Sequence, residues 1–447
     1  QRVDSDIVFT DIPEINASTD VLMQNVDSDV TVSAPSFEIS SNINALIQTV
    51  DSTAVFDNVV FNITASNTNM MQGVDSTGLS FEVINLLDNI FNPVNSGGTI
   101  VNSSGLIETV PDNTVRFTHD ANGRRGLLIE EARTNRMKNN RNFASSDWNR
   151  FGTGTASVPT VTSNAGTAPD GTNEADRIQF ALNGGNTTSD RSELSQPQTA
   201  ANGVDHTHSI YMKSFDGNTY FFRLSAAGAF AKLIEVGPEW KRYTQTWNGP
   251  TADRKFRLNL RGGGLGTSDS ADVLVWGAQS ETGSEATSLI FTDATTATRT
   301  DDLYDITGTD FSGIWNHTEG TVRCEYIFDN NNLNNTDVYS FTIADNNELL
   351  QIDQGNGGRV VVIANGISTA LTHDIGGGVP GQIYDVTVGI NSTELTITDN
   401  DGITTTISNT EGMPSPDRLL IGRGHGSGST PLNTIMYTLD YTPSKII

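Results

Sequence analysis

The sequence is poor in cysteine, in basic residues and in long apolar runs, and each shortage excludes a class of protein. The single cysteine, Cys324, excludes an intrachain disulfide framework, and its place in the alternating run TVRCEYIF favours a buried structural thiol over a nucleophile. Lys and Arg number 26 against 53 Asp and Glu, and this net charge of −27 argues against a general nucleic-acid-binding surface. The longest apolar runs fall well short of the roughly 18 residues that a membrane helix needs, so no membrane insertion is expected.

Persuasive helical periodicity is also missing from the 447 residues. The 42 glycines and the short runs of alternating apolar and polar residues are typical of strands joined by tight turns. The sequence therefore predicts an all-β protein, with two to four domains as the expectation for this length.

A tandem repeat occupies residues 1–97. The tripeptide Val-Asp-Ser recurs with its valines at Val3, Val26, Val50 and Val74, which are 23, 24 and 24 residues apart. Units of this length cannot bury an apolar face alone and must stack, so we expect a rod of β-repeats. A single-chain solenoid and an intertwined trimer are both compatible with the pattern.

The aspartates of the repeat admit two interpretations. Each can cap the turn that starts its unit. Alternatively, a ladder of carboxylates holds Ca²⁺, formed by Asp4, Asp27, Asp51 and Asp75. In that case a chelator should shift the melting of residues 1–97.

The first two residues, Gln1 and Arg2, occupy the last two columns of a repeat unit, matching Gln24-Asn25. We therefore expect the gene product to extend further towards the N-terminus, with more repeats or an attachment segment.

Beyond the repeat, we expect a Gly/Ser/Asn-rich connector over 98–125, a β-sandwich or jelly roll over 126–302 and a second β-sandwich over 311–447. Seven short alternating runs separated by turn dipeptides predict the strands of the first sandwich. They are GLLIEE, EADRIQFAL, HTHSIYMKS, NTYFFRLSA, KRYTQTW, KFRLNLRG and ADVLVWGAQSE. In the second sandwich, ELTITDNDGITTTIS predicts a hairpin around Asn400-Asp401-Gly402.

Charge is unevenly distributed along the chain. Residues 1–120 contain 16 acidic residues and only two basic ones, Arg2 and Arg116. A basic belt follows, and we expect it either to meet acidic surface, in this chain or on a neighbouring subunit, or to form a solvated loop. Its members are Arg124, Arg125, Arg133, Arg136, Lys138, Arg141 and Arg150.

Four motifs give the first sandwich a specific resemblance. GLLIEEARTNRMKNNRNFASSDWNR at Gly126, APDGTNEADRI at Ala168, EWKRYTQTW at Glu239 and VLVWGAQSETGSEATSLIFTDATTATRTDD at Val273 follow the order and spacing of a jelly-roll module. The module resembles the carbohydrate-binding-module-like domain of bacteriophage virion proteins, chiefly tail and head fibre components. The end of the chain, from Asp417, resembles a concanavalin A/laminin-G-like sandwich. The segment ARTNRMKNNRNF is more basic than such modules usually are.

The resemblance implies a virion structural protein with glycan-binding ancestry. We therefore expect a non-catalytic tail or head fibre, exposed on the virion surface, that binds host-surface glycans. The resemblance further implies a homotrimer that joins other virion proteins through the N-terminal repeats. The alternatives are a decoration protein that stabilises the particle, a glycan-degrading tailspike and a secreted bacterial adhesin.

Signatures of catalysis are not found in the sequence. It contains no G-x-S-x-G, P-loop or H-E-x-x-H motif, and no cofactor or enzymatic activity is expected. His206 and His208 share one face of a predicted strand and could offer two imidazoles to a metal, but no third ligand can be assigned.

The strongest candidate site lies on two predicted strands. In NTYFFRLS, alternation puts Arg223 on the face opposite the apolar residues of its strand. In KFRLNLRG, it puts Arg257, Asn259 and Arg261 together on the face opposite the apolar residues of that strand. If the strands are neighbours, these side chains line a single sheet face suited to the hydroxyls or carboxylates of an anionic glycan, the alternative being a solvated outer face. Further candidates for glycan contact are Lys213 and the indoles of Trp148 and Trp247.

Overall fold

The structure is a computed structural model, and the residues it describes fall into fourteen segments. These are 22–23, 37–40, 46–47, 61–64, 84–89, 93–198, 203–227, 230–248, 255–328, 337–343, 347–353, 359–372, 381–424 and 431–445. The chain divides into two units, Gln1–Glu82 and Val83–Ile447, which we describe separately. The described segments are built mostly of strands, as expected; their helices are the one-turn α1 (Gly308–Ser312) and the 3₁₀ turn η1 (Leu86–Asn89).

In the first unit, two pairs of short strands lie parallel at the spacing of the repeat. Strand β1 (Leu22–Met23) pairs with β3 (Leu46–Ile47), and β2 (Phe37–Ser40) pairs with β4 (Phe61–Thr64). Partners such as Phe37 and Phe61 are 24 residues apart, so equivalent columns of successive repeats are paired. The rod itself remains a prediction, and Asp4, Asp27, Asp51 and Asp75 lie outside the described residues.

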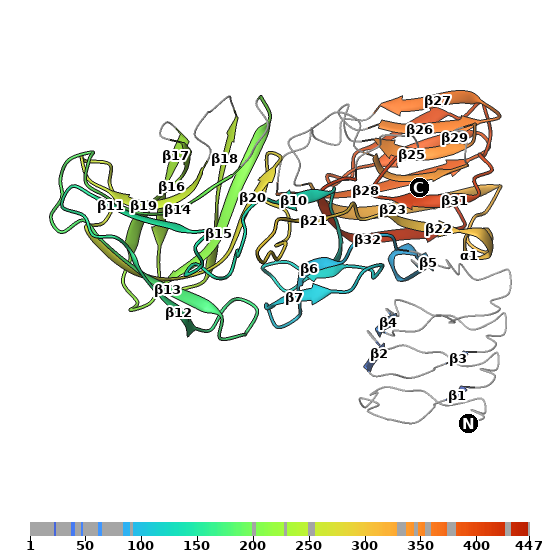
Figure 1. The fold of residues 1–447 in the computed structure, drawn as a ribbon. Helices are drawn as coiled ribbons and strands as arrows, with labels where there is room; N and C mark the ends of the chain where they lie inside the picture. The colour runs from blue at the N-terminus through green and yellow to red at the C-terminus, as the bar shows by residue number, and fades with distance from the viewer. Residues whose placement is uncertain are drawn as a thin grey trace. The chain divides into compact units, whose positions relative to one another are not determined.

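The first sandwich consists of two five-stranded antiparallel sheets (Figure 1). In order across one sheet, the strands are β11 (Asn149–Thr153), β14 (Arg191–Pro197), β19 (Lys255–Arg261), β16 (Tyr220–Ala227) and β17 (Phe230–Val236). In order across the other, they are β12 (Thr160–Gly166), β13 (Ala175–Ala181), β20 (Ser270–Thr282), β15 (Asp205–Ser214) and β18 (Lys241–Asn248). Because most neighbours in a sheet are distant in sequence, the chain crosses repeatedly between the two sheets, as in a jelly roll.

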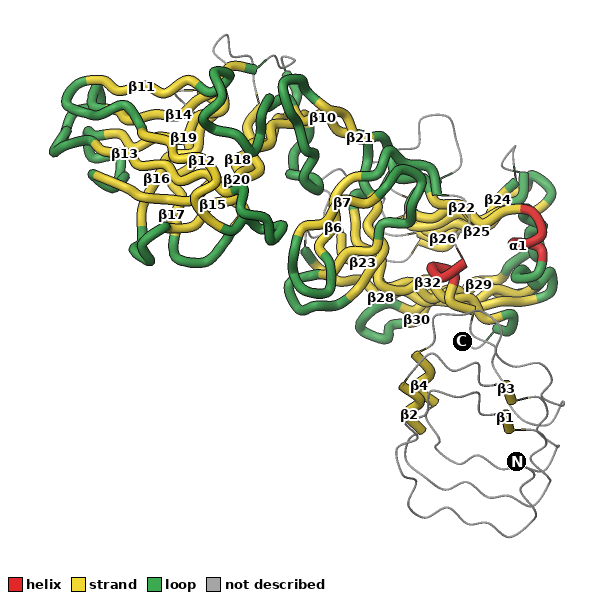
Figure 2. Tube along the Cα trace, turned by 60° about the horizontal axis from the view of Figure 1, so that its bottom comes forward, coloured by secondary structure: helices red, strands yellow, loops and turns green. Residues whose placement is uncertain are grey.

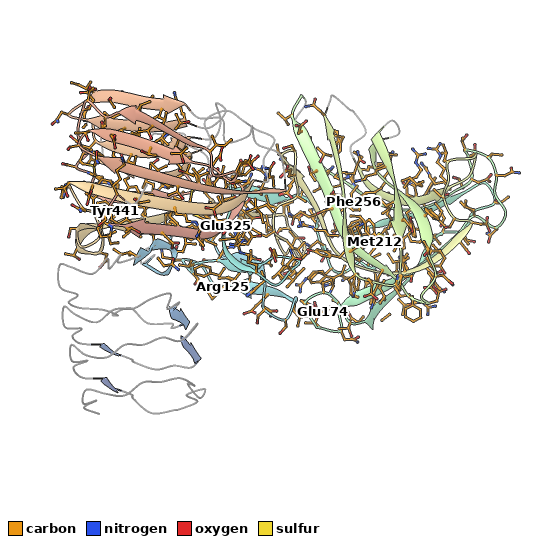
Figure 3. All side chains as sticks on the ribbon, turned by 180° about the vertical axis from the view of Figure 1, so that it is seen from behind. Arg125, Glu174, Met212, Phe256, Glu325 and Tyr441 are labelled. Carbon is orange, nitrogen blue, oxygen red and sulfur yellow. The ribbon has the colours of Figure 1, made fainter. Side chains whose placement is uncertain are left out.

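The core of this sandwich is made by the apolar positions of the alternating strands. Phe256, Leu258 and Leu260 of β19 are all fully buried and pack in one cluster with Met212 of the opposite sheet. Figure 3 labels Met212 and Phe256, one from each sheet. The period-two pattern in the sequence therefore fixes which face of each strand meets the core.

The second sandwich has a six-stranded and an eight-stranded sheet with one apolar core. Figure 2 shows the two sheets as two layers. The six strands, in order, are β22 (Tyr304–Thr307), β31 (Arg418–Ile421), β24 (Asp337–Thr342), β25 (Leu349–Asp353), β26 (Arg359–Ala364) and β27 (Ile367–Thr372). The other sheet runs β30 (Thr404–Ser408), β29 (Glu394–Thr398), β28 (Gln382–Asn391), β23 (Glu319–Phe328), β32 (Thr434–Thr442), β9 (Arg125–Ile129) and β8 (Phe117–His119), and β5 (Ile84–Asn85) also pairs with β32.

Two local predictions for this sandwich are confirmed. Strands β29 and β30 form the expected antiparallel hairpin, with Gly402 at a φ of 72° in the turn. Cys324 on β23 is fully buried, and burial raises the pKa of its thiol, which fits a structural role.

All seven strands expected between residues 126 and 300 are present, but the first joins a different sheet from the one expected. Residues 126–129, expected to open the first sandwich, lie on β9 and pair with β32, with Leu127 opposite Met436. Leu127 and Ile129 are fully buried in the core of the second sandwich. The connector expected at 98–125 contains the hairpin of β6 (Gly98–Val101) and β7 (Ile107–Val110), and also β8.

A buried cluster of charges joins the segments on either side of the first sandwich. Arg116, which precedes β8, donates to Asp302 at 2.6 Å and to Glu130 at 2.8 Å. Strand β21 (Ala297–Arg299) pairs with β10 (Arg133–Asn135) and ends at Arg299. The guanidinium of Arg299 lies 3.4 Å from Glu130 and 3.6 Å from Asp302. We refer to Arg116, Glu130, Arg299 and Asp302 as the charge cluster, and all four side chains are at most 7% exposed.

The basic belt meets acidic residues within this chain at three of its positions. Arg124 pairs with Glu325, Arg133 with Glu131, and Arg141 with Glu174. This is the first of the two expected arrangements, realised in cis. No helix in the described part of the chain is both long and apolar enough to cross a membrane.

Candidate functional site

Strands β16 and β19 are neighbours, which is the condition that the predicted polar face required. Arg223 is directly opposite Asn259, and Ser225 is opposite Arg257. Directly opposed residues of an antiparallel pair point to the same side of the sheet. Because the alternate residues of β19 are in the core, these four side chains lie on the face turned away from it. We call this the outer face of the sheet.

The strand register extends that face across the whole sheet as a single row. Asn259 is also opposite Glu193 of β14, Glu193 is opposite Phe151 of β11, and Arg223 is opposite Leu233 of β17. The central row therefore reads Phe151, Glu193, Asn259, Arg223, Leu233. With strands about 4.8 Å apart, five strands make a row roughly 19 Å long.

The middle of this row is buried even though it faces away from the core. Glu193 and Asn259 are each 4% exposed, and Arg257 beside them is 8% exposed. A solvated charged face, which was the alternative interpretation, would leave such side chains largely exposed. The centre of the outer face is instead a packed polar layer.

Both ends of the row are apolar and accessible. Phe151 is 40% exposed at one edge of the sheet and Leu233 is 47% exposed at the other. The guanidinium carbon of Arg191 lies 4.9 Å from the Phe151 ring centroid, which holds that ring beside the polar layer. Ligand sites combine apolar and aromatic side chains with a few fixed polar groups, and the row brings both kinds together.

Positive charge dominates the outer face. Its strands contribute five cations against the two anions Glu193 and Glu235, in a chain whose net charge is −27. The cations are Arg191, Arg223, Lys255, Arg257 and Arg261.

Glu193 organises two of the arginines. Its carboxylate oxygens lie 3.4 Å from Nε of Arg191 and 3.8 Å from Nε of Arg257. Arg261 donates from Nε to the carbonyl oxygen of Thr188 at 2.7 Å. These contacts restrict the three guanidinium groups without neutralising the excess positive charge.

Asn259 carries an unsatisfied acceptor at the centre of the row. Among the described residues, its Oδ1 is buried and has no hydrogen-bond partner. An unpartnered buried polar atom costs about 1–3 kcal/mol, so a ligand hydroxyl that donates to it would recover that cost.

Three predicted site residues lie elsewhere. Lys213 is on β15 of the other sheet, where its Nζ is 5.5 Å from the Trp240 ring centroid. Trp148 is 2% exposed and donates from Nε1 to the carbonyl of Asn139 at 3.1 Å. Trp247 is 3% exposed and stacks on His206 at 4.8 Å between ring centroids. The two indoles are packing residues, so neither can present a flat surface to a sugar.

Sequence reasoning missed Phe151, Arg191, Glu193 and Leu233. Strands β11 and β14 read NRFGT and RSELSQP, whose glycine, serines and proline are more typical of turns than of strands. The alternation of FAKLIEV in β17 was the one signal that could have identified Leu233.

The two histidines are packed inside the first sandwich. His206 and His208 are fully buried, and the Gln198 amide nitrogen lies 2.6 Å from Nε2 of His208. Burial, reinforced by His206, lowers the pKa of His208 to about 3, so its ring is neutral at physiological pH. Within the described segments, no three or more His, Cys, Asp or Glu residues are grouped so as to hold a metal ion.

Of the comparisons with known proteins, the one with solved structures finds proteins similar to this chain. No family model and no curated protein matches the chain. A family 11 carbohydrate-binding module from Clostridium thermocellum, in complex with a beta-1,3-1,4-mixed-linked tetrasaccharide, is 9% identical, with 34% of this chain and 95% of that chain covered and a TM-score of 0.23.

Two further similar structures span more of the chain. The tandem CBM22 domains of Xyn10C from Paenibacillus barcinonensis are 10% identical, with 71% of this chain and 98% of that one covered and a TM-score of 0.22. Domains LG4-5 of the mouse laminin alpha1 chain are 9% identical, covering 57% and 89%, with a TM-score of 0.23. Scores this low carry no function from those proteins to this chain.

Proposed function

We propose that this protein is a non-catalytic glycan-binding protein whose first sandwich holds an oligosaccharide across its outer face. The observation that carries the proposal is the central row, in which accessible Phe151 and Leu233 flank buried Glu193 and Asn259 and partly buried Arg223. Apolar side chains can pack on the faces of sugar rings, while fixed polar groups receive and donate hydrogen bonds to hydroxyls.

The absence of catalysis is part of the proposal. A glycosidase needs two carboxyl groups with separate roles, one of which must stay protonated to act as an acid. Of the two carboxylates on the described outer face, Glu193 contacts two guanidinium groups and Glu235 is exposed on the edge strand β17. The two carboxylates are on β14 and β17, with β19 and β16 between them, so they do not flank one position on the outer face.

The direct test is binding of the full chain to immobilised glycans. The informative variant is Phe151→Ala with Leu233→Ala, which removes both apolar ends of the row. Its control is Ile367→Ala with Ile403→Ala, since those isoleucines of the second sandwich are 56% and 57% exposed. We expect the first variant to bind at least tenfold more weakly and the control to bind as the parent does.

Two results would contradict the proposal. The first is that no glycan binds, and the second is that the Phe151→Ala, Leu233→Ala variant loses no more affinity than the control variant. Release of new reducing ends from any glycan that binds would contradict the non-catalytic part alone.

We further propose that the glycan is on a host cell surface and that the protein is a fibre of a bacteriophage particle, attached through its N-terminal repeats as a homotrimer. This finer role is supported by the four sequence motifs of the first sandwich. On particles carrying the Phe151→Ala, Leu233→Ala variant, we expect host adsorption to fall while particle stability is unchanged. Weaker particles with unchanged adsorption would favour the decoration protein instead.

A further inference from the structure

Arg223 differs from the other arginines of the outer face in having no partner among the described residues. Arg191 and Arg257 both face Glu193, and Arg261 donates to the carbonyl of Thr188. Among the residues that the structure describes, Arg223 forms neither a hydrogen bond nor an ion pair. It is nevertheless partly buried, in the middle of a sheet and opposite the buried Asn259.

The surroundings of Arg223 are unfavourable for a cation. Burial, and to a smaller extent the like charge of Arg261, lowers the pKa of Arg223. A guanidinium that is desolvated beside a second guanidinium is stabilised when an anion is placed near both. In the described structure the only buried carboxylate of the central row, Glu193, is on the far side of Asn259 and is occupied by Arg191 and Arg257.

Geometry also favours a planar anion over a point charge. A guanidinium offers paired N–H groups in one plane, which match the two oxygens of a carboxylate. Next to Arg223, the unpartnered Oδ1 of Asn259 needs a donor rather than an acceptor. A sugar that carries both a carboxylate and a neighbouring hydroxyl supplies the two groups side by side.

From this arrangement we infer that the outer face is selective for acidic glycans, and that Arg223 with Arg261 forms the subsite for the carboxylate of a uronic or other sugar acid. The inference rests on the proposed glycan-binding function and adds the chemical class of the ligand. Asn259 Oδ1 accepts a hydrogen bond from a hydroxyl of the same sugar, and Leu233 packs on its apolar side. Glu193 holds Arg191 and Arg257 in place. Its negative charge would repel a sugar carboxylate at the other half of the row, so the ligand binds in a single orientation across the sheet.

The experiment compares pairs of oligosaccharides that differ only in the carboxyl group. Each acidic oligosaccharide, from a panel containing uronic acids and nine-carbon sugar acids, is tested beside its carboxyl-reduced form and a sulfated analogue. Binding to the full chain is measured by calorimetric titration at low and moderate salt. We expect at least one acidic member to bind tenfold or more tightly than its reduced form.

Three variants assign that preference to Arg223. We expect Arg223→Gln to remove the preference while retaining the weaker binding of the reduced form, which also shows that the variant is folded. Arg223→Lys should restore part of it, because a charge returns without the planar fork. The control Lys213→Gln, which removes a cation from the other sheet, should keep the full preference.

The outcomes separate this inference from the proposed function. Equal binding of acidic and reduced forms, with loss of both in the Phe151→Ala, Leu233→Ala variant, would overturn the acidic subsite and leave glycan binding intact. Persistence of the preference in Arg223→Gln would also overturn it, as would a sulfated analogue that binds as tightly as the carboxylate. Failure of every glycan to bind would overturn both.

Discussion

Replacing Arg116 with Met should destabilise the protein strongly, because the guanidinium of Arg116 is the centre of the charge cluster. The side chain is fully buried. It contacts Asp302 at 2.6 Å and Glu130 at 2.8 Å, and it donates to the carbonyl of Thr99 at 2.7 Å and to the hydroxyl of Ser288 at 2.6 Å. The substitution leaves two buried carboxylates facing an apolar side chain of similar length.

The expected loss of stability follows from the contacts that remain after the substitution. Removing one partner of a buried ion pair costs about 3–5 kcal/mol. Arg299 still lies 3.4 Å from Glu130 and 3.6 Å from Asp302, so we expect the lower end of this range. For a domain of 150–250 residues, about 3 kcal/mol corresponds to a fall in melting temperature of roughly 6–12 °C.

Arg124→Met is the matched control. Arg124 pairs with Glu325, but its side chain is 37% exposed. An exposed pair contributes about 0–1 kcal/mol, so the control should lower the melting temperature by no more than roughly 4 °C.

Differential scanning calorimetry is the suitable assay, since a chain with two sandwich cores can show more than one transition. The comparison uses the transition that shifts most in each variant. A shift of Arg116→Met within 2 °C of the parent, or equal to that of the control, would refute the view that the cluster stabilises the fold.

Three further predictions test particular side chains. For His208, the folded pKa of about 3 lies below the ordinary 6.5, so the folded state binds fewer protons and its stability should fall as the pH drops from about 6.5 towards 3, by up to about 1.4 kcal/mol per pH unit. His208→Gln should lessen that slope in melting temperature against pH, and replacing the exposed His317 with Gln is the matched control. For Cys324, which is fully buried, a thiol reagent should modify no cysteine in the native chain and one per chain in denaturant; rapid native labelling would show that the thiol is accessible. Trp148→Phe should lower the free energy of unfolding by about 1–2 kcal/mol through the lost hydrogen bond to Asn139, and should leave glycan affinity unchanged. A large loss of affinity in a folded variant would show that Trp148 belongs to the binding site.

Local patterns in the sequence predicted local structure well. The alternation in KFRLNLRG identifies which residues of β19 are buried, because side chains on a strand alternate between the two faces whatever its neighbours are. The turn dipeptide Asp401-Gly402 marks the β29–β30 hairpin because glycine adopts its positive φ without strain. Alternation also placed Arg257, Asn259 and Arg261 together on one face of β19.

Partners distant in sequence could not be predicted in the same way. Leu127 and Met436 pair across more than 300 residues, and nothing in GLLIEE distinguishes a strand of the first sandwich from one of the second. Glu193 reaches the outer face on β14, a polar strand whose position depends on pairing with β11 and β19. Tryptophan occurs both in protein cores and at binding surfaces, so the sequence cannot tell these roles apart. The burial of Trp148 and Trp247 shows that both are structural.

The central claim is that a glycan lies across the outer face of the β11-β14-β19-β16-β17 sheet, and a crystal structure of the full chain with a bound acidic oligosaccharide tests it most directly. We expect sugar density along the central row, with a carboxylate within hydrogen-bond distance of Arg223, a hydroxyl donating to Asn259 and an apolar ring face against Leu233 or Phe151. Density over the other sheet, around Lys213 and Trp240, or on the second sandwich, would contradict the claim.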